Sequence, residues 1–441
     1  MLKRPGQSQC AAIPEIPIRD ASFPAPFSSG LEYSAPARGT WTIVHVGMLV
    51  PQAHEIFVCA AGCLRGVVLS AAEMNLAHRF STIAIEEKNV LEGDMEALII
   101  DGVTDILNRL PQKPPAVLLY TSCIHHFMGC DLDLCYRTLR QRFPNVDFTD
   151  CYMIPTMRKS GLTPDQIMRR QIYSLLKPRE KTGACAVLGN CFSMDDSSDL
   201  IRLVGSAGVK LHEITRCTTY GDYQTMAESS VYITTQPVAK VGGEALAQRL
   251  GGRHLYLPFS YDPAEIRKNL TALADSLGTS YDGGAALEAQ AESALEQAKA
   301  VIGNTPIALD YTFTPRPLGL ARLLLTHGFS VTRLYTDSFS GEEQADYAWL
   351  REHAPDLTVL PTVHPAMYAV QRHSGENILA LGQKAAYFTN SRNFVNIVEG
   401  GGMYGFDGIR RLAEEMIQAF QTEQDTARLI QIKGLGCESC I

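Results

Sequence analysis

The sequence predicts an α/β protein of three doubly wound domains with parallel sheets. Short apolar runs alternate with stretches of helical periodicity from about residue 42 onward, and strands that alternate with helices are typical of parallel sheets. A polar break at residues 177–183 and a Gly-Asn-Thr-Pro stop at residues 303–306 divide the series into three parts. Three such Rossmann-like domains, with their crevices facing one another, would surround a central cofactor cavity.

Individual elements are predicted by local patterns. Residues 116–120 form an apolar run typical of a buried strand. Helical periodicity covers residues 164–176, where Thr163 is expected to cap a helix that has Pro164 at its first position. A long helix is expected over 284–302. The other predicted elements are a helix at 197–206 and strands at 186–188, 210–214, 231–234, 306–311, 328–331, 357–360 and 377–381.

These breaks define five expected segments. Residues 1–40 are rich in Pro, Ser and Ala and are expected to form an extended arm, which either wraps a neighbouring subunit or is a flexible tail. Residues 426–441 are expected to form a C-terminal tail with a CxxC pair. The α/β domains between them are expected at residues 41–180, which carries the most informative cysteines, 181–303 and 304–425.

The bulk composition excludes several classes of protein. A hydrophobic content of 46% with 20% charged residues is ordinary for a globular chain of 441 residues. The net charge of −8 argues against nucleic acid as a partner. No apolar stretch reaches about 18 residues, which argues against a membrane span. No apolar region of a signal peptide follows the first residues, so we expect a cytoplasmic protein.

The twelve cysteines are more than packing requires. In a reducing compartment they indicate metal binding or catalysis rather than a disulfide framework. Several of them, such as Cys151 and Cys185, are expected to be buried as small hydrophobic residues. The terminal pair, Cys437 and Cys440, lacks a second CxxC that would complete a zinc site, and a redox pair, a set of cluster ligands and a flexible tail all remain open.

Cys63 and Cys123 stand out because each is expected where a strand gives way to a loop. The carboxyl ends of parallel strands are where ligands bind in open sheets, and thiolates collected there are suited to an iron–sulfur cluster. Cys59 is either a third ligand or a packed side chain. If only two or three thiolates come from this chain, the remaining ligands must come from a partner across an interface.

Three further features are candidates for a second site. The segment that contains Cys217 directly follows a predicted strand, and Cys217 is expected to open a helix whose dipole would lower the pKa of the thiol. Cys217 is a metallocluster ligand, a reactive thiol or a packed side chain. Gly400, Gly401 and Gly402 either let the backbone approach a bulky ligand or form a plain turn. Lys384 either pairs with an anionic ligand or lies on the solvated surface.

Together these segments resemble the component 1 family of nitrogenase and nitrogenase-like enzymes from about residue 40 to residue 420. The most specific match is RFST at 79–82 followed by EKNVLEGD at 87–94. GC at 62–63 and TSC at 121–123, followed by GCD at 129–131, are similar to the family's cluster-binding segments. Cys217 resembles the cysteine that ligates the active-site metallocluster, and Lys384 resembles a lysine near that cofactor's organic acid. YGFDG at 404–408 resembles the turn into the last helix.

The resemblance implies an oxidoreductase subunit that carries or shares an iron–sulfur cluster, 4Fe–4S or larger, through Cys63 and Cys123. Low-potential electrons would come from an ATP-dependent iron-protein reductase. They would pass to a second metallocluster or a substrate site bordered by Cys217, Lys384 and Gly400–Gly402. The family's habit of pairing subunits implies a paralogous subunit or a second copy of this chain as partner, with no role for nucleic acid or membrane.

Two departures from the family pattern bear on the activity. Residues 34–41 contain no cysteine, although the family has one about 25 residues before the position of Cys63. No histidine stands around Asn396, where the catalytic family places its histidine ligand to the cofactor. An Asn near that place is similar to the cofactor-assembly branch. The alternatives are therefore a non-catalytic scaffold for assembly of an iron–sulfur cofactor and, third, a tetrapyrrole reductase-type subunit.

Overall fold

The structure is a computed structural model that describes residues 14–28, 30–37, 39–153, 161–370, 372 and 377–429. The chain divides into two compact units. We call them the two-sheet unit, which contains Trp41–Ser193 and Gly208–Pro258, and the one-sheet unit, which contains the described residues of Met1–Thr40, Met194–Ala207 and Phe259–Ile432. Among the described helices none is long and apolar enough to cross a membrane.

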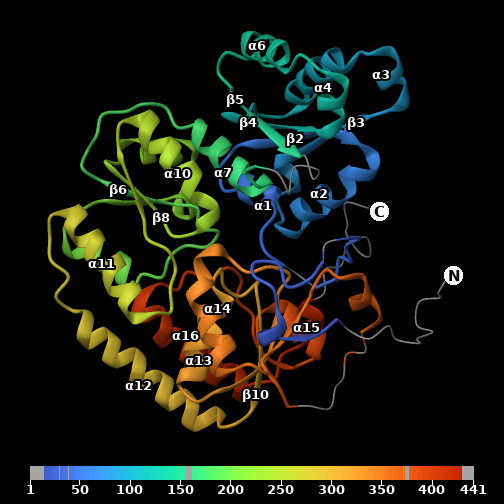
Figure 1. The fold of residues 1–441 in the computed structure, drawn as a ribbon. Coiled ribbons are helices and arrows are strands. Elements are labelled where there is room, and N and C mark those ends of the chain that lie inside the picture. Colours follow the sequence, from blue (N-terminus) through green and yellow to red (C-terminus); the bar gives the residue numbers. More distant parts are fainter. Residues whose placement is uncertain are drawn as a thin grey trace. The chain divides into compact units, whose positions relative to one another are not determined.

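The first sheet of the two-sheet unit is parallel, with the strand order β3-β2-β4-β5. Helices α4 and α6 cover one of its faces, as Figure 1 shows. Because both faces are covered, β4 is buried along its whole length and reads as a continuous apolar run. The strands are β2 (His54–Ala60), β3 (Phe80–Ile85), β4 (Ala116–Ser122) and β5 (Asp147–Met153).

The second sheet of the same unit is also parallel, with the order β7-β6-β8-β9. Helix α7 begins as the sequence predicted, because the Thr163 hydroxyl accepts from the Gln166 amide at 3.3 Å and Pro164 follows the cap. The C-terminal end of α7 is held by Arg249 of α10, which donates to the Tyr173 carbonyl in its last turn and to the Leu176 carbonyl just beyond it. The strands are β6 (Cys185–Leu188), β7 (Leu211–Glu213), β8 (Val231–Thr234) and β9 (Arg253–Tyr256).

The third sheet forms the one-sheet unit, with the order β1-β12-β11-β10-β13-β14. It is parallel except for β1, which pairs antiparallel with β12 at the edge. The arm expected at residues 1–40 thus contributes an edge strand to its own chain, which neither sequence-based alternative anticipated. The strands are β1 (Ile16–Pro17), β10 (Pro306–Asp310), β11 (Ser330–Tyr335), β12 (Thr358–Leu360), β13 (Leu379–Leu381) and β14 (Asn393–Val395).

The α-helices alternate with these strands (Figure 1). Those of the two-sheet unit are α1 (Ile43–Gly47), α2 (Ala61–Glu73), α3 (Glu87–Glu92), α4 (Met95–Arg109), α5 (Cys123–Met128), α6 (Leu132–Arg142), α7 (Pro164–Ser174), α9 (Tyr220–Thr225) and α10 (Pro237–Leu250). Those of the one-sheet unit are α8 (Asp199–Ser206), α11 (Pro263–Leu277), α12 (Gly284–Ile302), α13 (Pro317–Thr326), α14 (Gln344–His353), α15 (Gln383–Thr389) and α16 (Gly405–Gln421).

The predicted α/β class with three parallel, doubly wound sheets is confirmed. In each sheet the strand order reverses direction once, between β2 and β4, between β6 and β8, and between β10 and β13. Such reversal points leave a crevice at the carboxyl ends of the strands, where open α/β sheets bind their ligands. Functional side chains are therefore expected at the carboxyl edges of the three sheets, beside these reversal points.

The turn into α16 is held by a buried carboxylate of the same unit. Asp199, at the start of α8, is 2% exposed and accepts from the backbone amide of Phe406 at 2.6 Å and from that of Asp407 at 3.4 Å. Burial raises the pKa of Asp199 from 3.8 to about 6, although these two amides favour the charged form.

This shift predicts a specific pH dependence of stability. Between pH 3.8 and about 6 the folded state keeps a proton on Asp199 that the unfolded chain has released. The free energy of unfolding therefore falls as pH rises through this window and levels off above it. Asp199→Asn should lack this contribution, so the difference between variant and wild type should change by roughly 3 kcal/mol across the window. Denaturant unfolding of both proteins checks this, and parallel pH curves would contradict it.

Candidate functional site

Cys63 and Cys123 lie just beyond the carboxyl ends of β2 and β4, as predicted, but in helices that directly follow the strands rather than in loops. The two strands are neighbours, with Val58 opposite Thr121 in the ladder. Cys63 is the third residue of α2 and is exposed, and Cys123 is the first residue of α5 and is half-buried. Both thiols therefore lie at the carboxyl edge of the first sheet, at its reversal point, where solvent or a ligand can reach them.

Cys59 belongs to the same edge but has a different environment. It is 1% exposed and packs in the core that the two sheets share. Burial raises the pKa of the Cys59 thiol to about 12, and the charges of Cys63 and Cys123 act in the same direction. The three sulfur atoms are thus close enough to interact, but only two of them are accessible.

Local hydrogen bonds orient the short helix that carries Cys123. The His125 ring accepts from the backbone amide of Ser122 at Nδ1, at 3.0 Å, which closes a reciprocal cap at the start of α5. His125 is 1% exposed, and its burial lowers its pKa, so the neutral ring is favoured. The adjacent His126 is exposed. The two histidines therefore face different surroundings and do not form a metal pair.

The surface beside these thiols is apolar. Phe127 is 78% exposed and Met128 is 41% exposed, and both belong to the helix that Cys123 begins. Large apolar side chains clustered on a surface mark interaction sites in soluble proteins. This part of α5 is therefore suited to contact another protein chain.

The residues present fit part of an iron–sulfur site. Within the described ranges no group of three or more His, Cys, Asp or Glu side chains could hold a metal ion. A cubane cluster takes four thiolate ligands. The described part of this chain offers two accessible thiols, Cys63 and Cys123, at one edge, so it fits half of a ligand set.

Cys217 departs from the prediction in its conformation and its pKa. A 3₁₀ turn, Ile214–Arg216, follows β7, and α9 begins only at Tyr220, so Cys217 does not open a helix. Its thiol donates to the Glu213 carbonyl at 3.4 Å. Burial, followed by the charges of Asp222 and Glu213, raises the pKa of Cys217 to about 12. The expected lowering by a helix dipole is therefore wrong for this thiol.

Lys384 is buried rather than part of a solvated surface. It is 7% exposed at the start of α15, and its ammonium donates to the Ala37 carbonyl at 3.4 Å. Burial raises the pKa of the neighbouring Asp310, although hydrogen bonds to Thr312 and Ala385 and, last, the Lys384 charge act in the opposite direction. Asp310 ends β10 and accepts from the Ala385 amide at 2.5 Å. Lys384 thus lies at the reversal point of the third sheet, next to an acid that sequence analysis missed.

The remaining candidates, Asn396 and the three glycines, follow β14 in the same unit. Asn396 is exposed and accepts from the Gln383 amide nitrogen at 2.8 Å. Gly400, Gly401 and Gly402 all have positive φ angles, of 83°, 53° and 88°. L-amino acids with side chains rarely adopt this conformation, so the backbone of the turn itself requires glycine. Close approach of a ligand is not needed to explain the run.

The candidates thus fall into two groups. Cys59, Cys63, Cys123 and Cys217 belong to the two-sheet unit, whereas Lys384, Asn396 and Gly400–Gly402 belong to the one-sheet unit. The CxxC residues Cys437 and Cys440 lie outside the described residues.

Comparison with known proteins agrees with this architecture. The family model described as nitrogenase component 1 type oxidoreductase matches residues 42–421. The chain belongs to this family. No curated protein matches the chain in sequence.

Solved structures of a nitrogenase component share the fold. The structure titled "Nitrogenase Cp1 at pH 6.5" aligns with a TM-score of 0.66 and 14% identity over 90% of this chain and 94% of the other. "Nitrogenase Cp1 at pH 5" aligns with a TM-score of 0.55 and 14% identity over 89% of this chain and 90% of the other. At this identity the likeness concerns the fold alone.

Proposed function

We propose that this protein is a cytoplasmic subunit of a nitrogenase-like oxidoreductase complex. It binds an iron–sulfur cluster through Cys63 and Cys123 and passes low-potential electrons from an ATP-dependent iron-protein reductase to a second metallocluster or a substrate site. One observation carries the proposal: two accessible thiols follow neighbouring parallel strands at the reversal point of a sheet. Membership of the component 1 family supports it.

The part played by this chain is to hold and surround the cluster. The cluster, when bound, supplies one-electron transfer. Cys63 and Cys123 would provide the thiolates, whereas Cys59, which is 1% exposed in the core, would pack behind them rather than complete the ligand set. The neutral His125 ring keeps α5 in place through its cap on Ser122, and burial on the core side lowers the local dielectric, which tunes the potential.

The incomplete ligand set supports an oligomer. The two accessible thiols require further ligands from another chain, and Phe127 and Met128 provide an apolar surface beside them. A paralogous subunit or a second copy of this chain would supply those ligands. In a homodimer the contact would have twofold symmetry, so that both chains contribute the same residues.

A second site in the one-sheet unit would be bordered by Lys384, Asn396 and the Gly400–Gly402 turn, and Cys217, which belongs to the two-sheet unit, would be a further metallocluster ligand. Lys384 supplies a buried positive charge there, and a buried ammonium attracts an anionic group more strongly than an exposed one. The raised pKa of Cys217 favours its thiol, but a bound metal would displace that proton, since metal ligation deprotonates a thiol.

The alternative is a non-catalytic scaffold that holds an iron–sulfur cofactor during its assembly. One observation favours it: residues 377–429, which include β13, β14 and the glycine turn, contain no histidine. A cofactor at this edge would therefore lack an imidazole ligand from this segment and would be held more loosely.

The Cys217→Ala variant separates these functions from the third one, a tetrapyrrole reductase-type subunit. If Cys217 ligates a second metallocluster, removing its thiolate is expected to abolish one metal signal and leave that of the first cluster unchanged. With an organic substrate site, metal content should stay the same. Metal analysis and electron paramagnetic resonance of the variant and the wild type, both purified without oxygen, decide between them.

The redox role is tested by spectroscopy of the anaerobic complex. We expect a paramagnetic iron–sulfur signal that changes when dithionite is added, and that changes in the same way with the iron-protein reductase and ATP. A cluster that is reduced by dithionite but not by the reductase would favour the scaffold. Absence of any iron signal would refute both functions.

A further inference from the structure

A pocket of about 860 Å³ lies at the opposite edge of the first sheet from the cysteines. It is formed at the amino-terminal ends of the strands, where His54 begins β2 and Pro115 precedes β4. β2 has seven residues, so the pocket and the thiols lie roughly 20 Å apart along the strand. All lining residues belong to the two-sheet unit. The pocket is therefore separate from the candidate cluster edge.

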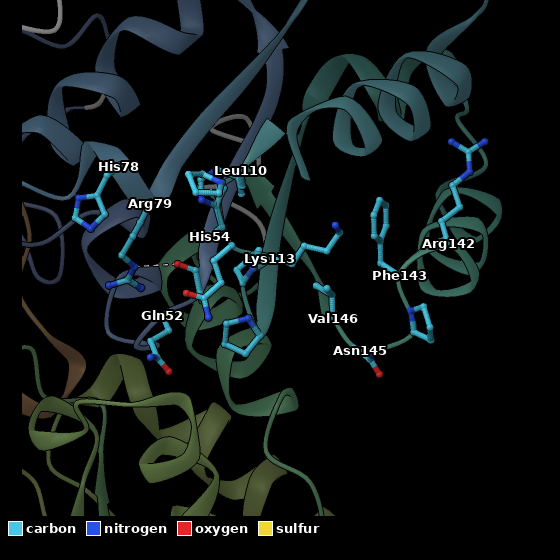
Figure 2. Close-up of a pocket in the computed structure, with 16 residues that line it drawn as sticks. Gln52, His54, His78, Arg79, Leu110, Lys113, Arg142, Phe143, Asn145 and Val146 are labelled. Carbon is cyan, nitrogen blue, oxygen red and sulfur yellow. Dashed lines mark hydrogen bonds between the residues drawn. The ribbon is translucent and has the colours of Figure 1, made fainter. Parts of the chain in front are cut away.

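The charge of this pocket is opposite to that of the chain. Of the sixteen described residues that line it, Arg79, Lys113 and Arg142 are cationic and none is Asp or Glu, although the whole chain has a net charge of −8. Figure 2 shows Arg79 at one side of the pocket and Arg142 at the other. A concave surface with one sign of charge concentrates ligands of the opposite sign.

Arg79 is fixed in place by the fold. Its guanidinium donates to the backbone carbonyls of Ala53, Met48 and Val50, at 2.9, 3.3 and 2.5 Å. These neutral acceptors orient the group without cancelling its charge, and they leave some of its N–H groups for a ligand. Burial lowers the pKa of Arg79, and the Glu55 charge acts in the opposite direction. Burial also holds the pKa of Glu55 well above its usual range, which favours the neutral carboxyl.

Lys113 provides the cation that is most available to a ligand. It is exposed, and in Figure 2 its side chain reaches into the space between His54 and Phe143. Within the described part of the chain it has no acid or carbonyl partner. Arg142, by contrast, donates to Asp101 at 3.2 Å and to Thr104 at 2.9 Å. Replacing Lys113 should therefore weaken ligand binding with little effect on the stability of the fold.

The remaining walls are largely apolar. Leu110, Phe143 and Val146 line the pocket together with several prolines. The volume is in the range of pockets that bind organic ligands and exceeds what a single inorganic ion would fill. His54 adds no positive charge to the pocket near neutral pH, because burial lowers its pKa to about 4.

From this combination we infer that the pocket binds a small organic anion with a phosphate or polycarboxylate head and an apolar or ring-shaped body. Lys113 contacts the head, Arg79 and Arg142 add positive charge at the two sides of the pocket, and the proline and Phe143 wall contacts the body. This inference does not depend on the proposed redox function, because no cysteine of the cluster edge takes part in it.

Equilibrium binding to the full-length chain, separated from any nucleotide-binding partner, tests the inference. The probes are inorganic triphosphate, citrate and ATP without magnesium, with adenosine as the uncharged control. We expect ATP to bind more tightly than triphosphate, because its ring contacts the wall of the pocket. Comparing the affinities of citrate and triphosphate shows whether the pocket prefers a polycarboxylate or a phosphate head. Binding should weaken as salt increases.

Two lysine variants give the matched comparison. Lys113→Gln should weaken binding of the anionic probes about tenfold or more. Lys210→Gln, which changes an exposed lysine just before β7 of the second sheet, should leave binding unchanged. Equal affinities of wild type and both variants would overturn the inference. So would binding of adenosine as tight as that of ATP, or the absence of binding by all three anions at low salt. Thermal unfolding of both variants without ligand confirms that they are folded.

Discussion

Replacement of Cys63 or Cys123 by serine is expected to remove the iron of the cluster at this edge, about four irons for each pair of subunits, from the anaerobically purified complex. The two thiols are the accessible sulfur ligands at the carboxyl edge of β2 and β4, and serine is a poor ligand for cluster iron, which prefers thiolate sulfur. Because neither thiol is part of the buried core, we expect the free energy of unfolding of the chain without metal to change little. Iron and sulfide analysis of each variant measures the effect.

Cys130→Ser is the matched control for these two variants. Cys130 is also partly exposed and lies only seven residues after Cys123, but burial and Glu96 raise the pKa of its thiol to about 11, which disfavours the thiolate. We expect this variant to keep its iron. Iron loss from Cys130→Ser equal to that from Cys63→Ser would mean that the ligand assignment is wrong.

Gly405→Ala is expected to be the most destabilising single substitution at the turn into α16. Gly405 has a φ of 72°, and a Cβ there would overlap the Asp199 carboxylate that holds this turn. The positive φ alone costs about 1–2 kcal/mol for an L-residue, and the overlap must be relieved by breaking the bonds from Asp199 to the backbone amides of α16. We expect a total loss of roughly 3 kcal/mol or more.

Gly278→Ala measures the conformational part of this effect alone. Gly278 ends α11 with a φ of 69°, but a Cβ there would meet no atom within 4 Å. Its replacement should therefore cost only the conformational term, about 1 kcal/mol. Denaturant unfolding of the two variants gives the comparison, and equal losses would show that Asp199 does not hold the turn as described.

The fold could be predicted from sequence because its elements have strong local patterns. The helix expected at 284–302 and the strand expected at 231–234 have those bounds in the structure. Thr163 and Pro164 begin α7 as predicted, because a cap and a first-turn proline act within a few residues. The arm was harder to predict, since β1 has only two residues and forms through pairing with a distant strand, β12.

The candidate site was predictable only in part. The positions of Cys63 and Cys123 at strand ends followed from apolar runs, and the structure brings them to one edge. The environments of Cys217 and Lys384 did not follow, because burial and neighbours such as Asp310 come from other parts of the chain. A lone acid that ends an apolar strand at residues 306–310 was the available signal for Asp310. The basic pocket had none, because its residues come from several loops.

The most direct test of the proposed cluster is to measure iron content together with molar mass. The tagged chain would be purified without oxygen from its own host, with whatever subunit copurifies. We predict an oligomer with about four irons for each pair of subunits at this edge, in line with two accessible thiols from each chain. A monomer with a complete cluster would contradict the shared ligand set, and an iron-free oligomer would contradict the cluster itself.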